Sequence, residues 1–227
     1  MLRLLALALL FVANSVIAAP QQLTAVYQAT RNGQPFANVT ETFTRDGERY
    51  KLESITQGIG VYALFGKRRL YSEGEVTAAG LRPTHFEQQQ GDQPRKAVSA
   101  DFDWAAATLT MKYKGKTNSA PLEEGAQDIL SFAYQFMFKP PQGNEVVMAV
   151  TTGRKMRVYR YRVAERDVAV DSEAGKYQAV HLVNAEQDDD QKELWLGAEA
   201  HHIPVRISMK DENGAKIEQT LTSLHVE

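Results

Sequence analysis

The chain has 227 residues, a formal net charge of −2 with neutral histidines, and no cysteine. The lack of cysteine excludes disulfide bridges, thiolate nucleophiles and cysteine metal sites. Basic residues are spread along the chain, which argues against nucleic acid as a partner because phosphate binding usually requires a clustered basic surplus.

The N-terminus has the pattern of a secretory signal peptide. A short positive start, Met1 to Arg3, precedes an apolar run from Leu4 to Ala13 and small residues before a cleavage site. The run is shorter than the roughly 20 apolar residues of a transmembrane helix. We therefore predict a signal peptide at residues 1–18, cleaved after Ala18, and a periplasmic location. The mature chain, residues 19–227, is expected to fold as a single domain without a membrane span.

Most of the mature sequence alternates between short β-strands and tight turns. Asn32-Gly33 and Asp46-Gly47 separate runs in which polar and apolar residues alternate. Such pairs favour hairpins because both central residues tolerate positive φ. The pattern resumes after residue 146 and ends in a hairpin at Asn213-Gly214. We expect about fourteen or fifteen strands, mainly antiparallel, with no linker between them.

An uncharged apolar stretch from Gly58 to Gly66 interrupts the hairpins. One interpretation is a buried strand or a short helix. Its flanking glycines also allow a mobile apolar flap at the mouth of a cavity, and a membrane-contacting loop is a third interpretation. The nearest approach to a basic patch, Lys67 to Arg69, follows directly. Such a run is typical of a solvated strand end.

The segment from Gln127 to Phe138 departs from the strand pattern. It has no turn residue and precedes Pro140 and Pro141, which cannot continue a helix. Asp128 is placed to cap the first turn, and apolar residues cover almost every face, so the predicted helix must be buried. A helix about 10 to 12 Å across fits the concave side of a bent sheet. We predict an all-β, mainly antiparallel fold: a strongly curved sheet or partly open β-barrel wrapped around one buried apolar helix.

Side chains suited to catalysis or metal binding are few. His201 and His202 would point to opposite faces of a strand and could not share one ion. The run from Asp188 to Asp190 lacks the alternating ligands and glycine of a calcium loop. Asp101 and Asp103 share a strand face and could act as paired carboxylates, although a solvated sheet face explains them more simply. We predict no metal, no cofactor and no catalytic residue, and the sequence gives no support for an enzyme.

Six motifs in chain order point to a known family. They are Gly80-Leu81-Arg82-Pro83, Phe102-Asp103-Trp104, Gln127-Asp128-Ile129-Leu130-Ser131, Leu194-Trp195-Leu196, Ile203-Pro204-Val205-Arg206-Ile207 and Ile217-Glu218-Gln219-Thr220-Leu221. Over nearly the whole mature chain they resemble the bacterial exported family catalogued as domain of unknown function 3108 (DUF3108), whose function is open. The last motifs of the chain are more distantly similar to the C-terminal sequence of the periplasmic lipoprotein carriers. That likeness implies a curved antiparallel sheet around apolar cargo.

Two functions fit these observations. The first is a periplasmic binding or carrier protein for an apolar, lipid-like ligand such as an acyl chain. The reason is that the two apolar segments hold more aromatic and aliphatic side chains than a one-layer sheet can easily bury. The predicted lining residues are Tyr62, Leu64, Phe65, Phe132 and Phe136. The second is an envelope scaffold with a filled core, in which an exposed strand edge recruits a protein partner. An envelope hydrolase would require a cleft with a polar dyad, and the sequence shows none.

Overall fold

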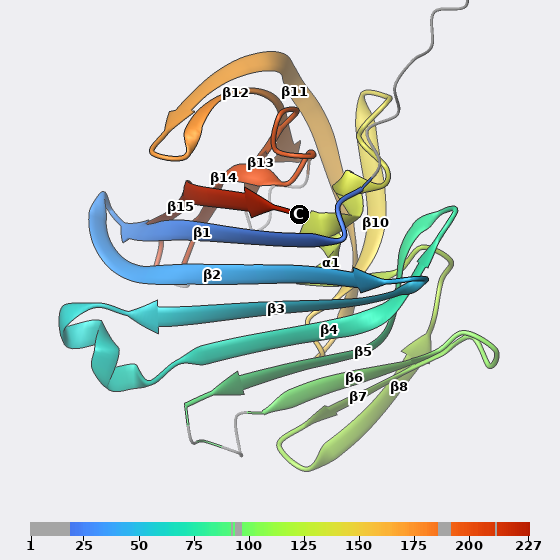
Figure 1. The fold of residues 1–227 in the computed structure, drawn as a ribbon. Helices are drawn as coiled ribbons and strands as arrows, with labels where there is room; N and C mark the ends of the chain where they lie inside the picture. Colours follow the sequence, from blue (N-terminus) through green and yellow to red (C-terminus); the bar gives the residue numbers. More distant parts are fainter. Residues whose placement is uncertain (1–18, 92, 94–96, 186–191, 212) are drawn as a thin grey trace, which may run out of the picture.

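The computed structural model describes residues 19–91, 93, 97–185, 192–211 and 213–227, and the strands in these ranges form one fifteen-stranded sheet (Figure 1). The strands are β1 (Gln22–Arg31), β2 (Gln34–Asp46), β3 (Arg49–Gly58), β4 (Arg68–Thr77), β5 (Gly80–Gln90), β6 (Val98–Asp103), β7 (Thr108–Tyr113), β8 (Lys116–Pro121), β9 (Gln127–Asp128), β10 (Glu145–Thr151), β11 (Met156–Ser172), β12 (Gly175–Asn184), β13 (Glu193–Gly197), β14 (Pro204–Lys210) and β15 (Lys216–Val226). The helical segments are η1 (Gly60–Phe65), α1 (Ser131–Tyr134) and η3 (Gln135–Met137), where η marks a 3-10 helix. The predicted signal peptide, residues 1–18, and the run from Asp188 to Asp190 lie outside the described residues.

The two halves of the chain build the sheet outward from its centre. The spatial order is β8-β7-β6-β5-β4-β3-β2-β1-β15-β14-β13-β12-β11-β10-β9, so the first and last strands are neighbours. Neighbouring strands are antiparallel except β9 and β10, which are parallel. Asn32 and Gly33 turn the first hairpin with φ of 49° and 80°, the geometry that their sequence predicts. The predicted mainly antiparallel sheet is confirmed.

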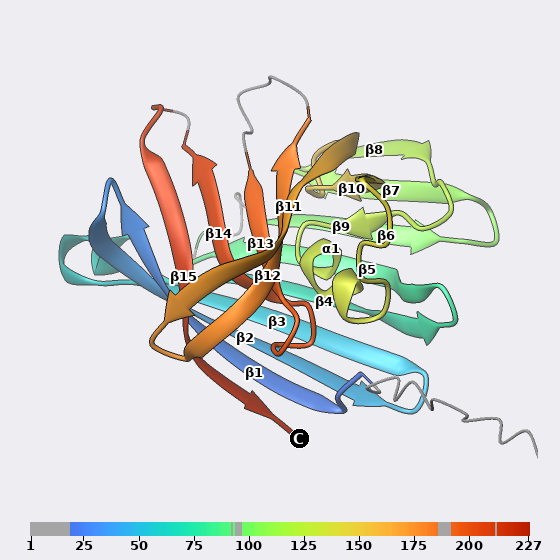
Figure 2. The same ribbon diagram turned by 90° about the horizontal axis from the view of Figure 1, so that it is seen from above.

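The sheet bends so strongly that its β9 end returns to the concave face of β4 and β5 (Figure 2). The Ser72 hydroxyl on β4 donates a hydrogen bond to Asp128 Oδ2 on β9 at 2.6 Å. Gln127 Nε2 donates to the carbonyl oxygen of Leu81 on β5 at 2.8 Å. These bonds join two regions that are distant in the strand order, and they complete the partly open barrel that the sequence predicts.

The segment from Gln127 to Phe138 is only partly helical. Its first two residues form β9 and pair with β10, and the helical part, α1 and η3, runs from Ser131 to Met137. Asp128 Oδ1 accepts hydrogen bonds from the amides of Leu130 and Ser131, both at 2.8 Å, and thus caps the first turn. The predicted length of the helix is wrong because the first two residues use their backbone groups to extend the sheet.

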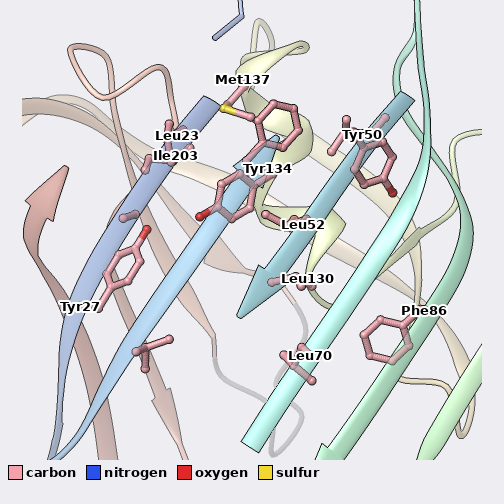
Figure 3. Close-up of a cluster of buried hydrophobic side chains, with 14 of the residues drawn as sticks. Leu23, Tyr27, Tyr50, Leu52, Leu70, Phe86, Leu130, Tyr134, Met137 and Ile203 are labelled. Atoms are coloured by element: carbon pink, nitrogen blue, oxygen red, sulfur yellow. The ribbon is translucent and has the colours of Figure 1, made fainter. Parts of the chain in front are cut away.

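The helical segment lies on the concave side of the sheet between two apolar clusters. Leu130, Tyr134 and Met137 belong to the larger cluster, together with Leu23 of the first strand (Figure 3). Phe132 and Phe136 belong to the smaller cluster, which includes side chains of β10 to β13. Because both sides of the segment are covered, its predicted burial is confirmed.

The stretch from Gly58 to Gly66 contains η1, a helix with no buried residue. Val61, Leu64 and Phe65 are 72%, 88% and 66% exposed. The interpretation as a short helix is correct, and the interpretation as a buried element is wrong. The concave side of the sheet is already filled by the segment that follows β9, and η1 lies in the connection between β3 and β4, beyond the ends of both strands (left in Figure 1).

Candidate functional site

The five side chains predicted to line a ligand cavity lie in two separate places. Phe132 and Phe136 are buried on the helical segment, with 5.7 Å between their ring centroids. The hollow beside Phe132 has a volume of about 20 Å³, which suits a single water molecule and not an acyl chain. Tyr62, Leu64 and Phe65 lie on η1 outside the core. The structure therefore does not bring the two groups together around one cavity.

Two larger hollows lie at the end of the sheet where β4 begins and β5 and β7 end. A groove of about 950 Å³ crosses β5, β6 and β7, and a hollow of about 380 Å³ lies beside η1 and the turn after β10. The groove is lined by residues that include Gln88, Val98, Ser99, Lys112 and Tyr113, and the hollow by Phe65, Gln88, Gln90, Gln93 and Arg154. Because both include Gln88, they adjoin at this residue, and we call the two together the rim site.

Strand alternation turns polar side chains into the barrel at the rim site. Arg68 shares the inward face of β4 with Leu70 and Ser72, both buried. Gln88 likewise shares the inward face of β5 with Phe86, since successive side chains of a strand alternate between faces. Arg68 Nη2 donates a hydrogen bond to Gln88 Oε1 at 2.9 Å. The rim site is therefore a polar layer built directly above the apolar core.

Two arginines bring positive charge to the rim site. Burial, together with the like charge of Arg154, lowers the pKa of the Arg68 guanidinium. Arg154 lies over the ring of Tyr113, with 4.3 Å between the guanidinium carbon and the ring centroid. No carboxylate among the described residues forms a salt bridge with either arginine. Uncompensated charge at a buried position is costly, and an anion at this place would relieve that cost.

Backbone contacts hold η1 at the edge of the rim site. Gln90 Nε2 donates a hydrogen bond to the carbonyl oxygen of Phe65 at 2.9 Å, and the Gly91 amide donates to the carbonyl oxygen of Lys67 at 2.7 Å. Gly66 has a φ of 72°, and a Cβ on it would lie 3.0 Å from the Cα of Gly91. This close approach fixes the end of η1 against the end of β5, so that Phe65 lines the smaller hollow.

The sequence pattern points to only part of the rim site. Phe65 is a predicted lining residue, whereas the run from Lys67 to Arg69 is interpreted as a solvated strand end. For Arg68 that interpretation is wrong, because the side chain turns into the barrel. The sequence does contain a signal for this orientation: Arg68 lies two residues before Leu70, so both side chains point to the same face of the strand. Arg154 has no such signal, since its position depends on how the turn after β10 packs against β7.

The other polar pairs noted in the sequence have structural roles. Asp101 Oδ1 lies 2.7 Å from His85 Nδ1, and Asp103 Oδ1 accepts a hydrogen bond from a backbone amide at 2.9 Å. His201 and His202 lie in a turn with φ of 52° and 59°, so the prediction of strand geometry for them is wrong. Within the described ranges, no three metal-binding side chains cluster, and no helix is long and apolar enough to cross a membrane.

Two carboxyl groups inside the barrel link the helical segment to the sheet. Glu41 accepts hydrogen bonds from the hydroxyls of Ser54 at 3.0 Å and Tyr134 at 2.9 Å. Burial raises the pKa of Glu41 above its ordinary 4.5 in spite of these bonds. Burial also raises the pKa of Asp128, although the Ser72 hydroxyl and two backbone amides donate to it. Both groups thus hold the fold together.

Comparisons with known proteins agree with this architecture. A family model described as "Protein of unknown function (DUF3108)" matches residues 26–222, and no curated protein matches the sequence. Among solved structures, the chain is similar to a beta-barrel-like protein of domain of unknown function DUF1849 from Brucella abortus. The TM-score is 0.59 at 13% identity, over 92% of this chain and 99% of that one. At this identity the likeness shows the fold alone, and the distant likeness to lipoprotein carriers stays a prediction.

Proposed function

The chain belongs to the DUF3108 family of proteins of unknown function, and we propose that it is a periplasmic binding or carrier protein for a lipid-like ligand in the bacterial cell envelope. The observation that supports the proposal most is the groove of about 950 Å³ across β5, β6 and β7. Ligand sites are typically concave and about 300 to 1,000 Å³ in volume. The signal-peptide pattern supports the location.

In this proposal the ligand lies in the rim site and not in the interior of the barrel. Val98 and the ring of Tyr113 give the groove an apolar surface, and Phe65 on η1 gives the adjoining hollow another. The interior is unsuited to a ligand because Phe132 and Phe136 fill it. The helix η1 is exposed and apolar, so an acyl chain would contact it on entering the rim site.

Native mass spectrometry after gentle purification tests the proposal. We expect a fraction of the protein to carry one molecule with the mass of a lipid or fatty acid, and the purified, delipidated protein to bind oleate. Repeated absence of any bound lipid, together with no binding of oleate, would contradict a carrier.

A blocked groove provides the matched test. In Gln88→Trp a large ring enters the groove from the inward face of β5, because Gln88 lines it beside Val98, and binding of oleate should fall sharply. In Ser119→Trp the same ring is placed on the exposed strand β8 outside the groove, and binding should remain. Equal binding by the two variants would show that the ligand lies elsewhere.

The packed interior favours a second candidate, an envelope scaffold that binds a protein partner. β8 is the last strand at one end of the sheet order, and Lys116 to Ser119 are exposed along it. An exposed edge of this kind offers backbone groups for strand addition, although its lysine and Pro121 discourage non-specific pairing. Crosslinking in cells from a photoreactive residue at position 118 would trap one dominant protein if the scaffold candidate is correct.

A further inference from the structure

The charges of the rim site identify one chemical group that its ligand must carry. Arg68 is partly buried and its Nη2 is bonded to the neutral side chain of Gln88, and Arg154 lines the smaller hollow together with Gln88. A salt-bridge network on the protein usually neutralises such a pair, and the described residues provide none here. By contrast, the neighbouring Arg69 on the outer face of β4 is paired with Glu53 and Glu87.

A purely structural role explains this arrangement less well. Polar side chains commonly cover the end of a barrel core, and glutamines alone would do so without charge. Burial and the like charge of Arg154 instead both lower the pKa of Arg68, although Arg154 itself is exposed on the turn after β10. Guanidinium groups present several N–H donors in a planar fork that matches the two oxygens of an oxyanion. Arg154 lies over Tyr113, which fixes its orientation toward the site.

The apolar surfaces beside the arginines set the shape of the rest of the ligand. Gln88 belongs both to the hollow that contains Arg154 and to the groove lined by Val98 and Tyr113. A molecule with a charged head at Arg154 can therefore extend its chain past Gln88 into the groove.

We propose that Arg154, supported by the positive charge of Arg68 on the other side of their shared neighbour Gln88, binds the oxyanion head, a carboxylate or a phosphate, of an amphipathic ligand whose apolar chain lies in the groove across β5, β6 and β7. This inference rests on the proposed function and specifies its ligand class. Neutral lipids are poor ligands in this account, because they offer no anionic oxygen to either guanidinium group, whose partners among the described residues are the uncharged Gln88 and Tyr113 side chains.

Three kinds of probe separate the contributions of head and chain. Oleate has both, oleyl alcohol has the chain without the charge, and acetate or inorganic phosphate has the charge without the chain. We expect the delipidated full chain to bind oleate at least about tenfold more tightly than oleyl alcohol, since tenfold corresponds to about 1.4 kcal/mol and one charge-assisted hydrogen bond supplies that much. Calorimetric titration at fixed ionic strength measures each affinity, and acetate and phosphate should bind far more weakly than oleate.

Charge-removing variants test the residues. Arg154 is exposed, so Arg154→Gln should fold normally, and Arg68→Met keeps the apolar stem while it removes the charge. Each should weaken oleate binding by about fivefold or more and leave oleyl alcohol binding unchanged. Arg49→Gln makes the same change in net charge at the far end of β3, where Arg49 is exposed, and should have no effect. If Arg68→Met does not fold, the Arg154→Gln result decides alone.

The outcomes distinguish the two proposals. Equal affinity of the wild type for oleate and oleyl alcohol, or unchanged oleate binding by Arg154→Gln, would overturn the oxyanion head and leave the groove intact. Binding of acetate or phosphate as tight as that of oleate would overturn the amphipathic ligand, because the site would then take a free anion. Binding of none of the probes would overturn the proposed function itself.

Discussion

Two apolar segments of this chain lie in opposite environments. The segment from Gln127 to Phe138 fills the barrel, and the stretch from Gly58 to Gly66 lies outside it at the rim (Figures 1 and 2). Phe136 is 1% exposed and Leu64 is 88% exposed. Hydrophobic character alone does not separate them, because both are rich in aromatic and aliphatic residues.

Polar anchors explain the difference. The buried segment carries Gln135, whose Oε1 accepts the Leu81 amide at 2.6 Å and whose Nε2 donates to the Ala79 carbonyl at 2.9 Å. Gly80 lies between these two partners, and a Cβ on it would collide with the side-chain amide of Gln135. Such bonds satisfy backbone groups that burial would otherwise leave unpaired. The stretch from Gly58 to Gly66 has no charged or amide side chain of its own, and the bond that Gln90 donates to its Phe65 carbonyl is exposed to solvent.

The largest expected effect on stability comes from the buried segment between Gln127 and Phe138. Phe136→Ala should destabilise the protein by about 3 to 5 kcal/mol, because it removes a large side chain from a packed cluster and leaves a cavity. Leu64→Ala on η1 should change stability by less than about 0.5 kcal/mol, since the side chain is exposed. Urea denaturation measures both variants. Similar losses in the two would show that the regions do not differ as described.

The next effect concerns the cap of the helical segment. Asp128→Ala should cost about 3 kcal/mol, because it leaves the Ser72 hydroxyl and the amides of Leu130 and Ser131 without their acceptor. Asp128→Asn keeps one acceptor oxygen for the amides and should cost clearly less. Thermal unfolding compares the two substitutions. A loss of the same size in both would mean that the charge, and not the acceptor geometry, stabilises this end of the helix.

A smaller effect appears in the pH dependence of stability. Burial raises the pKa of Glu41 above its ordinary 4.5, so the folded state holds the proton more tightly than the unfolded chain does. The contribution of Glu41 is therefore complete below about pH 4.5 and is lost as the pH rises through the folded-state pKa. Relative to Glu41→Gln, the wild type should lose stability as the pH rises from 4 toward neutrality. Parallel stability curves for the two proteins would contradict this.

The smallest effect on stability, with a clear effect on binding, is expected at the rim. Phe65→Ser removes an exposed apolar side chain that lines the smaller hollow, so the free energy of unfolding should stay within about 0.5 kcal/mol of the wild-type value. Oleate binding should weaken, because an apolar surface of the site is lost. Val61→Ser, on the same helix but not among the residues that line the hollow, is the control. Equal binding by both variants would show that η1 takes no part in the site.

The sequence predicts the fold better than the site. Hairpin turns such as Asn32-Gly33 depend on local backbone preference, and burial of Phe132 and Phe136 follows from an all-round apolar pattern. The pairing of Gln127 and Asp128 with β10 depends on long-range contacts that a local pattern does not show. The rim site needs three such contacts at once, because β4, β5 and the turn after β10 meet there only in the folded barrel.

Photo-crosslinking maps the ligand most directly. A fatty acid with a diazirine in its chain is bound to the full chain, irradiated, and the labelled residues are identified by mass spectrometry. If the ligand occupies the rim site, labels should appear at Val98, Tyr113 or Phe65. Labels at Phe132 or Phe136 would contradict the account, because they would place the ligand inside the barrel.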